Sequence, residues 1–374
     1  MAVIKPVKPV IPNLDLIDEP ADFFDRVKEE FPAFWSQNKF LSDYPESFVV
    51  YQQEKDDRTH TGLIGYIDIR EYLDKKIIRH ENTLQAKRNQ MMELFFQREA
   101  HVKPALLAYS RVDEIEALLE KCIDIYPVLY QQEYRKAIHR FWLVNEQAHI
   151  DEFKRLFKEK VARTYIADGH HRSEATAIMF RKILKLYGEE TGGKPYDVLL
   201  SAFFASDQLT IHEFNRVVVT QNNYSDKGFK AELRKHFIIE KQGGQFFPAA
   251  KNEIGMFIRK KWFKLTPKPH LLNKKDKLID RLDVSLLNRV ILKKVLGIKD
   301  VRHDARVKYV EGPKGLGSLE KKVGKNQSAV AFSLFPIRIE ELMAIADADE
   351  IMPPKSTWFE PRMHNGFVST RFEI

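Results

Sequence analysis

Cysteine is almost absent from this chain of 374 residues, since Cys122 is the only one. A single cysteine excludes an internal disulfide framework and any structural zinc site built on cysteines. No run of apolar residues approaches the roughly 20 that a membrane-spanning helix needs. Residues 1–12 lack the apolar segment of a secretory signal. We therefore expect a cytoplasmic protein without a membrane partner.

The two most widespread phosphate-binding loops are missing as well. The sequence contains no G-x-x-x-x-G-K-[ST] loop and no G-x-G-x-x-G fingerprint at the end of a strand. Residues 312–317 are rich in glycine but contain Pro313, and they fit a turn before a short helix better. A P-loop NTPase and a Rossmann dehydrogenase are therefore disfavoured.

The composition is typical of a soluble globular protein, with 44% hydrophobic and 30% charged residues. Most of the net charge of +8 lies in residues 259–277, where eight lysines and arginines stand against one acid, Asp276. Such a segment is either a polyanion-binding patch or a solvated hairpin and loop. We favour the hairpin, because no nucleic-acid-binding motif is present, and we do not expect a nucleic-acid partner.

Helical and strand patterns alternate irregularly along the chain. Pairs of strands separated by helices predict an α+β fold of mixed α/β type rather than a regular βαβ array. We expect an N-terminal lead and helix over residues 1–45, an α/β core over residues 46–222 and a C-terminal α+β region over residues 223–374. The last region contains a basic β insertion, residues 236–281, in which residues 254–264 are predicted as one strand.

The most informative stretch follows a short apolar run that ends in Asp-Gly. Two histidines and an arginine come next, and a helical pattern then begins. The residues of this turn are Asp168, Gly169, His170, His171 and Arg172. The predicted helix ends at Gly188, and one apolar face of it is formed by Ala177, Phe180, Leu184 and Tyr187.

This order of strand, turn and helix predicts an anion site. Unpaired backbone N–H groups and the helix dipole favour an anion at a helix N-terminus. Arg172 adds a planar fork that matches phosphate or carboxylate oxygens, and Gly169 allows a close backbone approach. The alternative is a glycine turn capped by Asp168. The density of functional side chains favours the anion site, with phosphate as the expected ligand.

The segment from His80 to Thr83 precedes another predicted helix. Glu81 is a candidate general base for a hydroxyl group, and His80 is a candidate for positioning a phosphate. The alternative is a capping cluster in which Asn82 is the N-cap and its neighbours are exposed.

Residues 352–362 form a proline-rich loop that is stiff enough to present polar groups to a ligand. The polar groups are those of Lys355, Ser356 and Thr357. Lys355 offers a point charge to a phosphate. The alternative is a purely structural loop.

Asp168 and Arg216 each have two interpretations. Asp168 either holds magnesium with the phosphates of a nucleotide, since that ion keeps much of its water, or caps the helix. Arg216 either joins the anion site or makes a structural ion pair with Glu213 or Asp168. No His-Glu-x-x-His pattern is present, and the adjacent His170 and His171 diverge too far to share a zinc ion, so we expect no structural zinc.

These segments together resemble a known family. The Ala-Asp-Gly-His-His-Arg run of residues 167–172 is similar to the signature of a bacterial family catalogued as domain of unknown function 1015. Residues 78–83, 212–218 and 352–362 resemble that family in the same order. A Pro-Tyr-Asp-Val motif that is usual near the N-terminus of the family is missing here, which leaves open whether this member is active.

The resemblance implies a relation to archaeal free-serine kinases and, more remotely, to the ParB/sulfiredoxin-like fold. It thus implies a ParB/sulfiredoxin-like core with an additional mixed sheet and a C-terminal elaboration. A sulfiredoxin-like reaction is disfavoured, because Cys122 lies outside the signature. The leading hypothesis is a small-molecule kinase that transfers a phosphoryl group from ATP or ADP, with magnesium, to a hydroxyl acceptor such as L-serine.

Each candidate residue has a role in this hypothesis. The catalytic candidates are Glu81, Asp168, His171 and Lys355, and Asp168 is also the metal candidate. The phosphate- and nucleotide-binding candidates are Gly169, His170, His171, Arg172, Arg216, Lys355, Ser356 and Thr357. The substrate-binding candidates are His80 and Thr83. Two alternatives stay open: a non-catalytic or regulatory nucleotide-binding module, as the ParB relation allows, and a polyanion-binding protein that uses residues 259–277.

Overall fold

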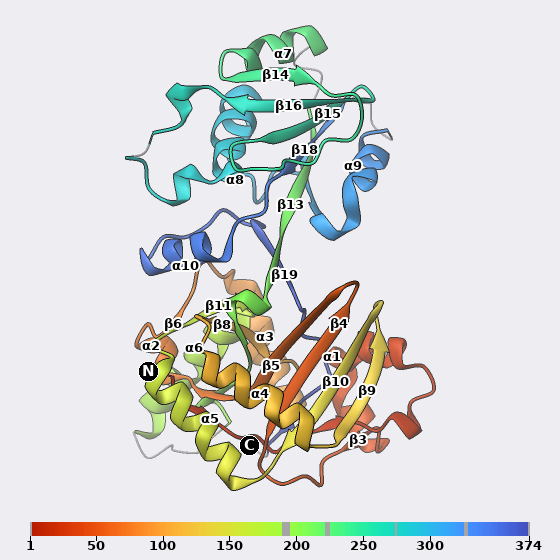
Figure 1. Cartoon of the computed structure of the whole chain (residues 1–374), viewed down its shortest axis with the longest axis vertical. Coiled ribbons are helices and arrows are strands. Elements are labelled where there is room, and N and C mark those ends of the chain that lie inside the picture. Colours follow the sequence, from red (N-terminus) through yellow and green to blue (C-terminus); the bar gives the residue numbers. More distant parts are fainter. Residues whose placement is uncertain (1, 189–194, 221–224, 274, 325–327, 373–374) are drawn as a thin grey trace. The chain divides into compact units, whose positions relative to one another are not determined.

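The computed structural model describes residues 2–188, 195–220, 225–273, 275–324 and 328–372. The chain forms two compact units (Figure 1). Unit 1 comprises residues 1–210 and 361–374, and unit 2 comprises residues 211–360. The N-terminal lead thus belongs to unit 1, and the chain returns to unit 1 at its C-terminal end. The boundary expected after residue 222 falls at residues 221–224, which lie outside the described residues.

Unit 1 is built around a mixed sheet with the strand order β6-β11-β8-β12-β5-β4-β10-β9, and β1 pairs with β5. The strands are β1 (Ile4–Lys5), β4 (Phe48–Lys55), β5 (Arg58–Asp68), β6 (Ile77–Ile78), β8 (Ala105–Tyr109), β9 (Val128–Tyr134), β10 (Ala137–Val144), β11 (Thr164–Asp168) and β12 (Val198–Ala205). β11 is parallel to β6 and β12 is parallel to β8, whereas β4, β5, β9 and β10 pair in antiparallel fashion. The expected mixed α/β class is confirmed.

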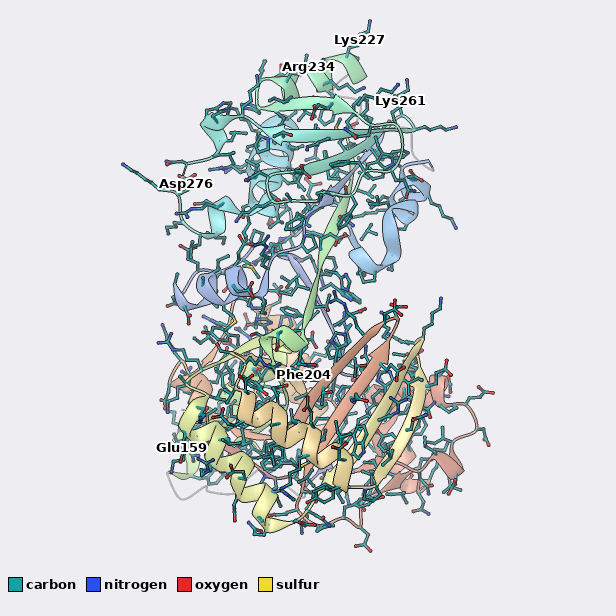
Figure 2. The ribbon with its side chains drawn as sticks, in the orientation of Figure 1. Glu159, Phe204, Lys227, Arg234, Lys261 and Asp276 are labelled. Carbon is teal, nitrogen blue, oxygen red and sulfur yellow. The ribbon has the colours of Figure 1, made fainter. Side chains whose placement is uncertain are left out.

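Unit 1 also contains six α-helices in its described residues. They are α1 (Pro20–Ser36), α2 (Arg70–Leu73), α3 (Gln85–Arg98), α4 (Asp113–Ile125), α5 (Gln147–Lys160) and α6 (His170–Tyr187). α4 and α5 bury Leu119 and Phe153 in a core that also holds Leu107 of β8 and Phe203 of β12. Each such buried side chain stabilises the folded state by roughly 1.5–3 kcal/mol. Phe204, the next residue along β12, is also buried in unit 1 (Figure 2).

The C-terminal segment is bound to unit 1 by aromatic packing and by backbone hydrogen bonds. The ring of Tyr130 stacks on that of Phe141 with centroids 4.2 Å apart, and the Phe367 ring packs edge-on at 5.7 Å from Phe141. The Gly366 N–H donates to the Val102 carbonyl oxygen at 2.8 Å. Two short sheets add to this frame: β7 (Ala100–His101) with β20 (Thr370–Arg371), and β2 (Ile11–Pro12) with β3 (Phe40–Leu41).

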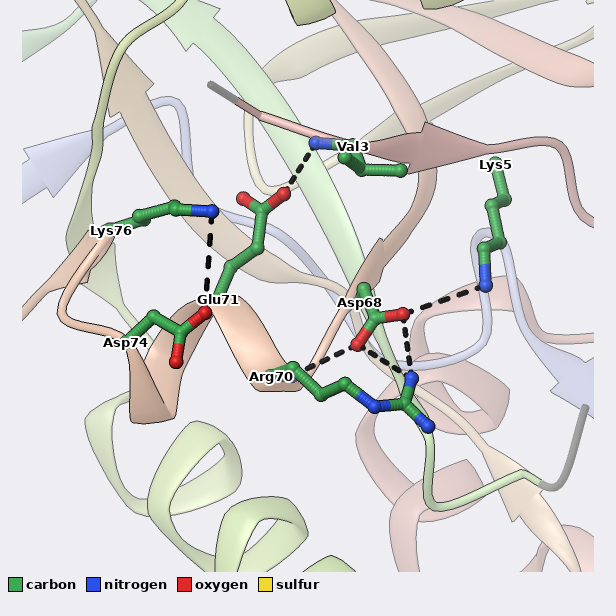
Figure 3. Close-up of polar contacts among 7 residues, drawn as sticks. All are labelled: Val3, Lys5, Asp68, Arg70, Glu71, Asp74 and Lys76. Atoms are coloured by element: carbon green, nitrogen blue, oxygen red, sulfur yellow. Dashed lines mark hydrogen bonds and ion pairs between the residues drawn. The ribbon is translucent and has the colours of Figure 1, made fainter. Parts of the chain in front are cut away.

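The N-terminal strand is fixed by buried and half-buried carboxylates (Figure 3). The Val3 N–H donates to Oε1 of Glu71 at 2.5 Å, and Glu71 is only 4% exposed. Burial raises the pKa of the Glu71 carboxyl, and the hydrogen bond from Val3 opposes this shift. Asp68 pairs with Lys5 at 3.6 Å and with Arg70 at 2.9 Å. These contacts hold β1 against β5 and α2.

Unit 2 contains a second sheet with the order β14-β16-β15-β18-β13-β17, and β19 pairs with β13. The strands are β13 (Thr210–Val219), β14 (Phe237–Lys241), β15 (Ile254–Ile258), β16 (Lys261–Pro267), β17 (Val307–Glu311), β18 (Ala329–Leu334) and β19 (Thr357–Glu360). The helical segments are α7 (Asp226–Arg234), α8 (Asp283–Leu286), a π-helical stretch (Leu287–Val295), α9 (Gly315–Gly324) and α10 (Ile339–Asp347).

Two local predictions were wrong. Residues 254–264 are not one strand, because Arg259 and Lys260 have φ values of +49° and +57° and close a hairpin between β15 and β16. Lys261, just after this turn, is exposed (Figure 2). Tyr187 is 74% exposed rather than buried, because the core that α6 covers ends near Leu184.

Within the described ranges, no helix is both long and apolar enough to span a bilayer.

Candidate functional site

The predicted strand, turn and helix are present as β11, Gly169 and α6. β11 is buried between β6 and β8, and a bulge between Ile166 and Asp168 changes the register just before the turn. Such bulges re-aim the side chain that follows. Gly169 is the N-cap of α6 and has a φ of +109°, which favours glycine. A Cβ atom at Gly169 would lie only 2.8 Å from Nη2 of Arg172.

Asp168 lies among three cationic side chains. Its carboxylate oxygens are 3.2 Å from Nη2 of Arg172, 3.4 Å from Nζ of Lys103 and 3.9 Å from Nη2 of Arg362. Burial alone would raise the pKa of Asp168, but Lys103, Arg172 and Arg362 together hold that pKa well below its usual range. Asp168 is therefore ionised. It orients Lys103, which lies just before β8, Arg172 of α6 and Arg362 of the C-terminal segment.

Arg172 and Lys103 are held in place but keep capacity for a further acceptor. Nη2 of Arg172 also donates to the Pro104 carbonyl oxygen at 3.1 Å, whereas its Nε is buried and has no hydrogen-bond partner among the described residues. Burial lowers the pKa of Lys103 to about 8; Asp168 opposes this shift, and Arg172 and Arg362 add to it. An anion that bound here would receive charge-assisted hydrogen bonds from preorganised donors.

A cavity of about 230 Å³ opens beside these groups. Four cationic residues line it and no carboxylate does: Lys28 of α1, Arg98 of α3, Lys103 and Arg172. Nε and Nη2 of Arg98 are buried without a hydrogen-bond partner in the described part of the chain. Buried donors that lack acceptors are costly, so this lining favours an anionic ligand.

The segment around His80 packs against the first turn of α6. The rings of His80 and His170 meet edge to face with centroids 4.4 Å apart, and both residues are more than nine-tenths buried. Burial lowers the pKa of His170 to about 4 and the pKa of His80 well below its usual range. Both rings are therefore neutral near pH 7. His170 can offer a neutral imidazole to a ligand, and its Nε2 has no hydrogen-bond partner among the described residues.

Thr83 and Glu174 organise a second polar cluster beside the same turn. Nη1 of Arg88 donates to Oγ1 of Thr83 at 3.2 Å and lies 3.5 Å from Oε1 of Glu174. Arg79 pairs with Glu174 at 3.1 Å, and the Tyr72 hydroxyl donates to it at 2.7 Å. The hydroxyl of Thr83 thus contacts an arginine, and its substrate-binding role stays a prediction.

The capping alternative for this segment is wrong both in its N-cap and in the exposure of His80, which is 2% exposed. α3 begins at Gln85 and its N-cap is Leu84, so Asn82 does not cap it. Glu81 is half-buried in the connection between β6 and α3, and His171 is half-buried in the first turn of α6. Their catalytic roles stay predictions. The structure does bring the segment at residues 80–83 to the signature, although the two lie far apart in the sequence.

The remaining candidates belong to unit 2. Arg216 is 1% exposed, donates to the Lys355 carbonyl oxygen at 2.9 Å and lies over the Tyr309 ring at 5.2 Å. Burial lowers the pKa of Arg216 to about 10. The expected pair with Glu213 is replaced by these contacts, and Glu213 instead accepts a hydrogen bond from Asn215 at 2.9 Å. Arg216 therefore shapes the proline-rich loop.

Within that loop the three polar residues differ. Lys355 is exposed, has a φ of +54° and places Nζ 5.5 Å from the centre of the Phe214 ring. The Ser356 hydroxyl donates to the Pro353 carbonyl oxygen at 2.6 Å, so it closes the turn. Thr357 begins β19. Their phosphate-binding roles stay predictions.

Sequence reasoning missed most of the cations around the cavity. Lys28, Arg98 and Lys103 are single basic residues in unrelated segments, and Arg362 was noted only as the end of a motif. The weak signal was Lys103, a lone cation next to Pro104 and a fully buried strand. No group of three or more histidine, cysteine, aspartate or glutamate residues able to hold a metal occurs in the described ranges.

Comparison with known proteins gives a family but no characterised relative. Over residues 10–285 the chain matches the family described as "Protein of unknown function (DUF1015)". No curated protein matches. The solved structures to which the chain is similar include the following three. C-terminally truncated SbnI from Staphylococcus aureus is 12% identical, with 81% of this chain and 85% of that chain covered and a TM-score of 0.41. A free serine kinase variant in complex with AMP is 12% identical, with 79% and 87% covered and a TM-score of 0.40. A second variant, in complex with ADP, is 14% identical, with the same coverage and a TM-score of 0.38. TM-scores below 0.5 do not establish a common fold, so function is inferred from this chain's own site.

Replacing Gly169 by alanine should separate the anion site from the fold. The added Cβ would be strained at φ +109° and would displace the Arg172 guanidinium. We expect phosphate affinity to fall about tenfold, as for loss of one charge-assisted hydrogen bond, in isothermal titration calorimetry. The control is Gly188→Ala at the other end of α6, where φ is +74° but nothing lies within 4 Å. Equal affinities in both variants would contradict the assignment.

Anion binding should also depend on the charge of Lys103. Its ammonium group is protonated below a pKa of about 8 and attracts an anion, and it becomes neutral as the pH rises through that value. We therefore expect pyrophosphate to bind more weakly above pH 8, with proton uptake on binding near pH 8. Titrations in buffers of different ionisation enthalpy measure both effects. A Lys103→Arg variant keeps its charge and should bind equally at pH 7 and 9; a wild-type profile as flat as that of the variant would exclude Lys103 from the site.

Proposed function

The chain belongs to the DUF1015 family of proteins of unknown function, and we propose that unit 1 binds the phosphate groups of a nucleotide in the cation-lined cavity. One observation carries this proposal: four cations line one cavity, and buried guanidinium nitrogens of Arg98 and Arg172 have no acceptor among the described residues. Phosphate oxygens are strong acceptors that match the geometry of a guanidinium.

The charge balance of the site supports a ligand with more than one negative charge. Asp168 neutralises part of the charge of Lys103, Arg172 and Arg362, and it fixes their positions before a ligand arrives. Of these three cations, Lys103 and Arg172 line the cavity. Donors that are already oriented do not have to reorganise when charge develops on a transferred phosphoryl group.

We further propose that the protein is a small-molecule kinase, as the family resemblance implies. The hydroxyl oxygen of an acceptor such as L-serine would attack the terminal phosphorus of ATP or ADP. The bond from that phosphorus to the bridging oxygen would break, and AMP or ADP would leave. The hydroxyl proton would pass to a base, for which Glu81 is the candidate. Lys103 and Arg172 would stabilise the negative charge on the phosphoryl oxygens.

Magnesium fits Asp168 poorly. A divalent cation at this carboxylate would lie beside Lys103, Arg172 and Arg362, which repel it. The geometry favours Asp168 as an orienting residue. Magnesium would supply charge neutralisation only as the ion that nucleotide phosphates carry with them.

The test is a binding and turnover assay on the full chain. ADP and ATP would be titrated with magnesium by calorimetry, and phosphoserine formation from L-serine would be followed by phosphorus NMR. We expect Arg172→Ala to weaken nucleotide binding about tenfold or more, because it removes a charged donor. Arg181→Ala, an exposed arginine of the same helix, is the matched control.

Each outcome of this assay has a defined meaning. Phosphoserine formation that is lost in Arg172→Ala but kept in Arg181→Ala establishes the kinase activity. Binding without product supports the non-catalytic nucleotide-binding module. Absence of binding to either nucleotide refutes both, and salt-sensitive binding of nucleic acid would then favour residues 259–277.

A further inference from the structure

The cations of the cavity come from two separate sets. Lys103 and Arg172 contact Asp168 and belong to the signature. Lys28 and Arg98 come from α1 and α3, and neither forms an ion pair with Asp168 within the described residues. The signature explains the first set. In the proposed function the second set adds positive charge to the cavity, but no ligand group of its own is assigned to it.

Arg98 is the stronger member of this second set. Its Nε and Nη2 atoms are buried and have no hydrogen-bond partner in the described part of the chain. Burial lowers the pKa of Arg98 to about 10, Glu29 opposes the shift and Arg172 adds to it, so the guanidinium remains charged near pH 7. A buried charge without a partner is unfavourable unless a ligand supplies one.

Lys28 lines the same cavity. It pairs with Glu29 at 3.0 Å, but Glu29 is 60% exposed. Exposed pairs of this kind contribute little, so the Lys28 ammonium group can exchange Glu29 for a ligand at small cost. Lys28 and Arg98 can therefore act together on one anionic group.

Apolar side chains also line the cavity. They include Phe95 of α3, Met179 of α6 and Leu200 of β12, and all three of these side chains are buried in the fold. Apolar lining favours the connecting atoms of a ligand over water, whereas the cationic side chains select for anionic groups.

We propose that Arg98 and Lys28 form a second anion subsite, so that the cavity takes a ligand, or a pair of joined groups, with two anionic ends. The inference rests on the proposed function, because the first end is the phosphate held by Lys103 and Arg172. The second group is a carboxylate or a phosphate. It comes either from the next phosphate of a nucleotide or from an acceptor that carries an acid group.

The size of the cavity agrees with this assignment. A cavity of 150 Å³ holds benzene, so by proportion about 230 Å³ holds roughly nine non-hydrogen atoms. Pyrophosphate and phosphoserine are of this size. A whole nucleotide is larger, so its base and sugar would extend out of the cavity.

The first test compares orthophosphate with pyrophosphate in calorimetric titrations. Arg98→Met removes the charge but keeps the apolar stem of the side chain. We expect this variant to bind pyrophosphate about tenfold more weakly and orthophosphate almost unchanged, because only pyrophosphate reaches both subsites. Arg172→Ala should weaken both ligands, and Arg181→Ala should change neither. Arg98→Met should melt at no lower temperature than the wild type, since it removes an unpaired buried charge.

The second test identifies the source of the second anionic group with ADP, AMP and phosphoserine. Loss of affinity for ADP but not AMP in Arg98→Met assigns the subsite to the next phosphate of the nucleotide. Loss of affinity for phosphoserine, with the affinity for ADP unchanged, assigns the second subsite to the carboxylate of the acceptor. If Arg98→Met weakens none of the three, or weakens orthophosphate as much as pyrophosphate, the second subsite is refuted while the phosphate site stands. A wild-type protein that binds no phosphate at all refutes the proposed function itself.

Discussion

The ionised carboxylate of Asp168 is the interaction on which the candidate site depends. It attracts Lys103 from the segment before β8, Arg172 from α6 and Arg362 from the C-terminal segment. Without this anion these cations would repel one another. With it they converge on one place, and part of their charge remains available to a ligand. The site is thus assembled from three parts of the sequence by one negative charge.

This role explains several features of unit 1 that would otherwise be unrelated. Gly169 must take a left-handed conformation so that the chain turns directly from β11 into α6 without displacing Arg172. The C-terminal segment must pack on unit 1 through Phe367 and the backbone of Gly366 to deliver Arg362. Neutral His80 and His170 fill the space beside the helix start without adding further positive charge.

The sequence predicted those elements whose structure depends on neighbouring residues in the chain. The strand, the Asp-Gly turn and the helix after it were predictable because apolar periodicity and a glycine mark each boundary. The partners of Asp168 were not, since Lys103 and Arg362 are isolated cations whose proximity depends on the whole of unit 1. The hairpin at Arg259 and Lys260 was missed because a basic pair in left-handed conformations carries no glycine signal. Arg216 was predicted either as a ligand contact or as part of an ion pair, and the sequence does not reveal its contacts with the Lys355 carbonyl oxygen and the Tyr309 ring.

The central claim is that a phosphate binds between Arg172 and Lys103 in unit 1. A crystal structure of the protein grown with ADP tests it most directly. The account predicts a phosphate group within hydrogen-bond distance of the Arg172 guanidinium and the Lys103 ammonium group, with Asp168 still paired to both side chains. A nucleotide bound elsewhere, for example along residues 259–277, with the cavity of unit 1 filled only by water, would contradict it.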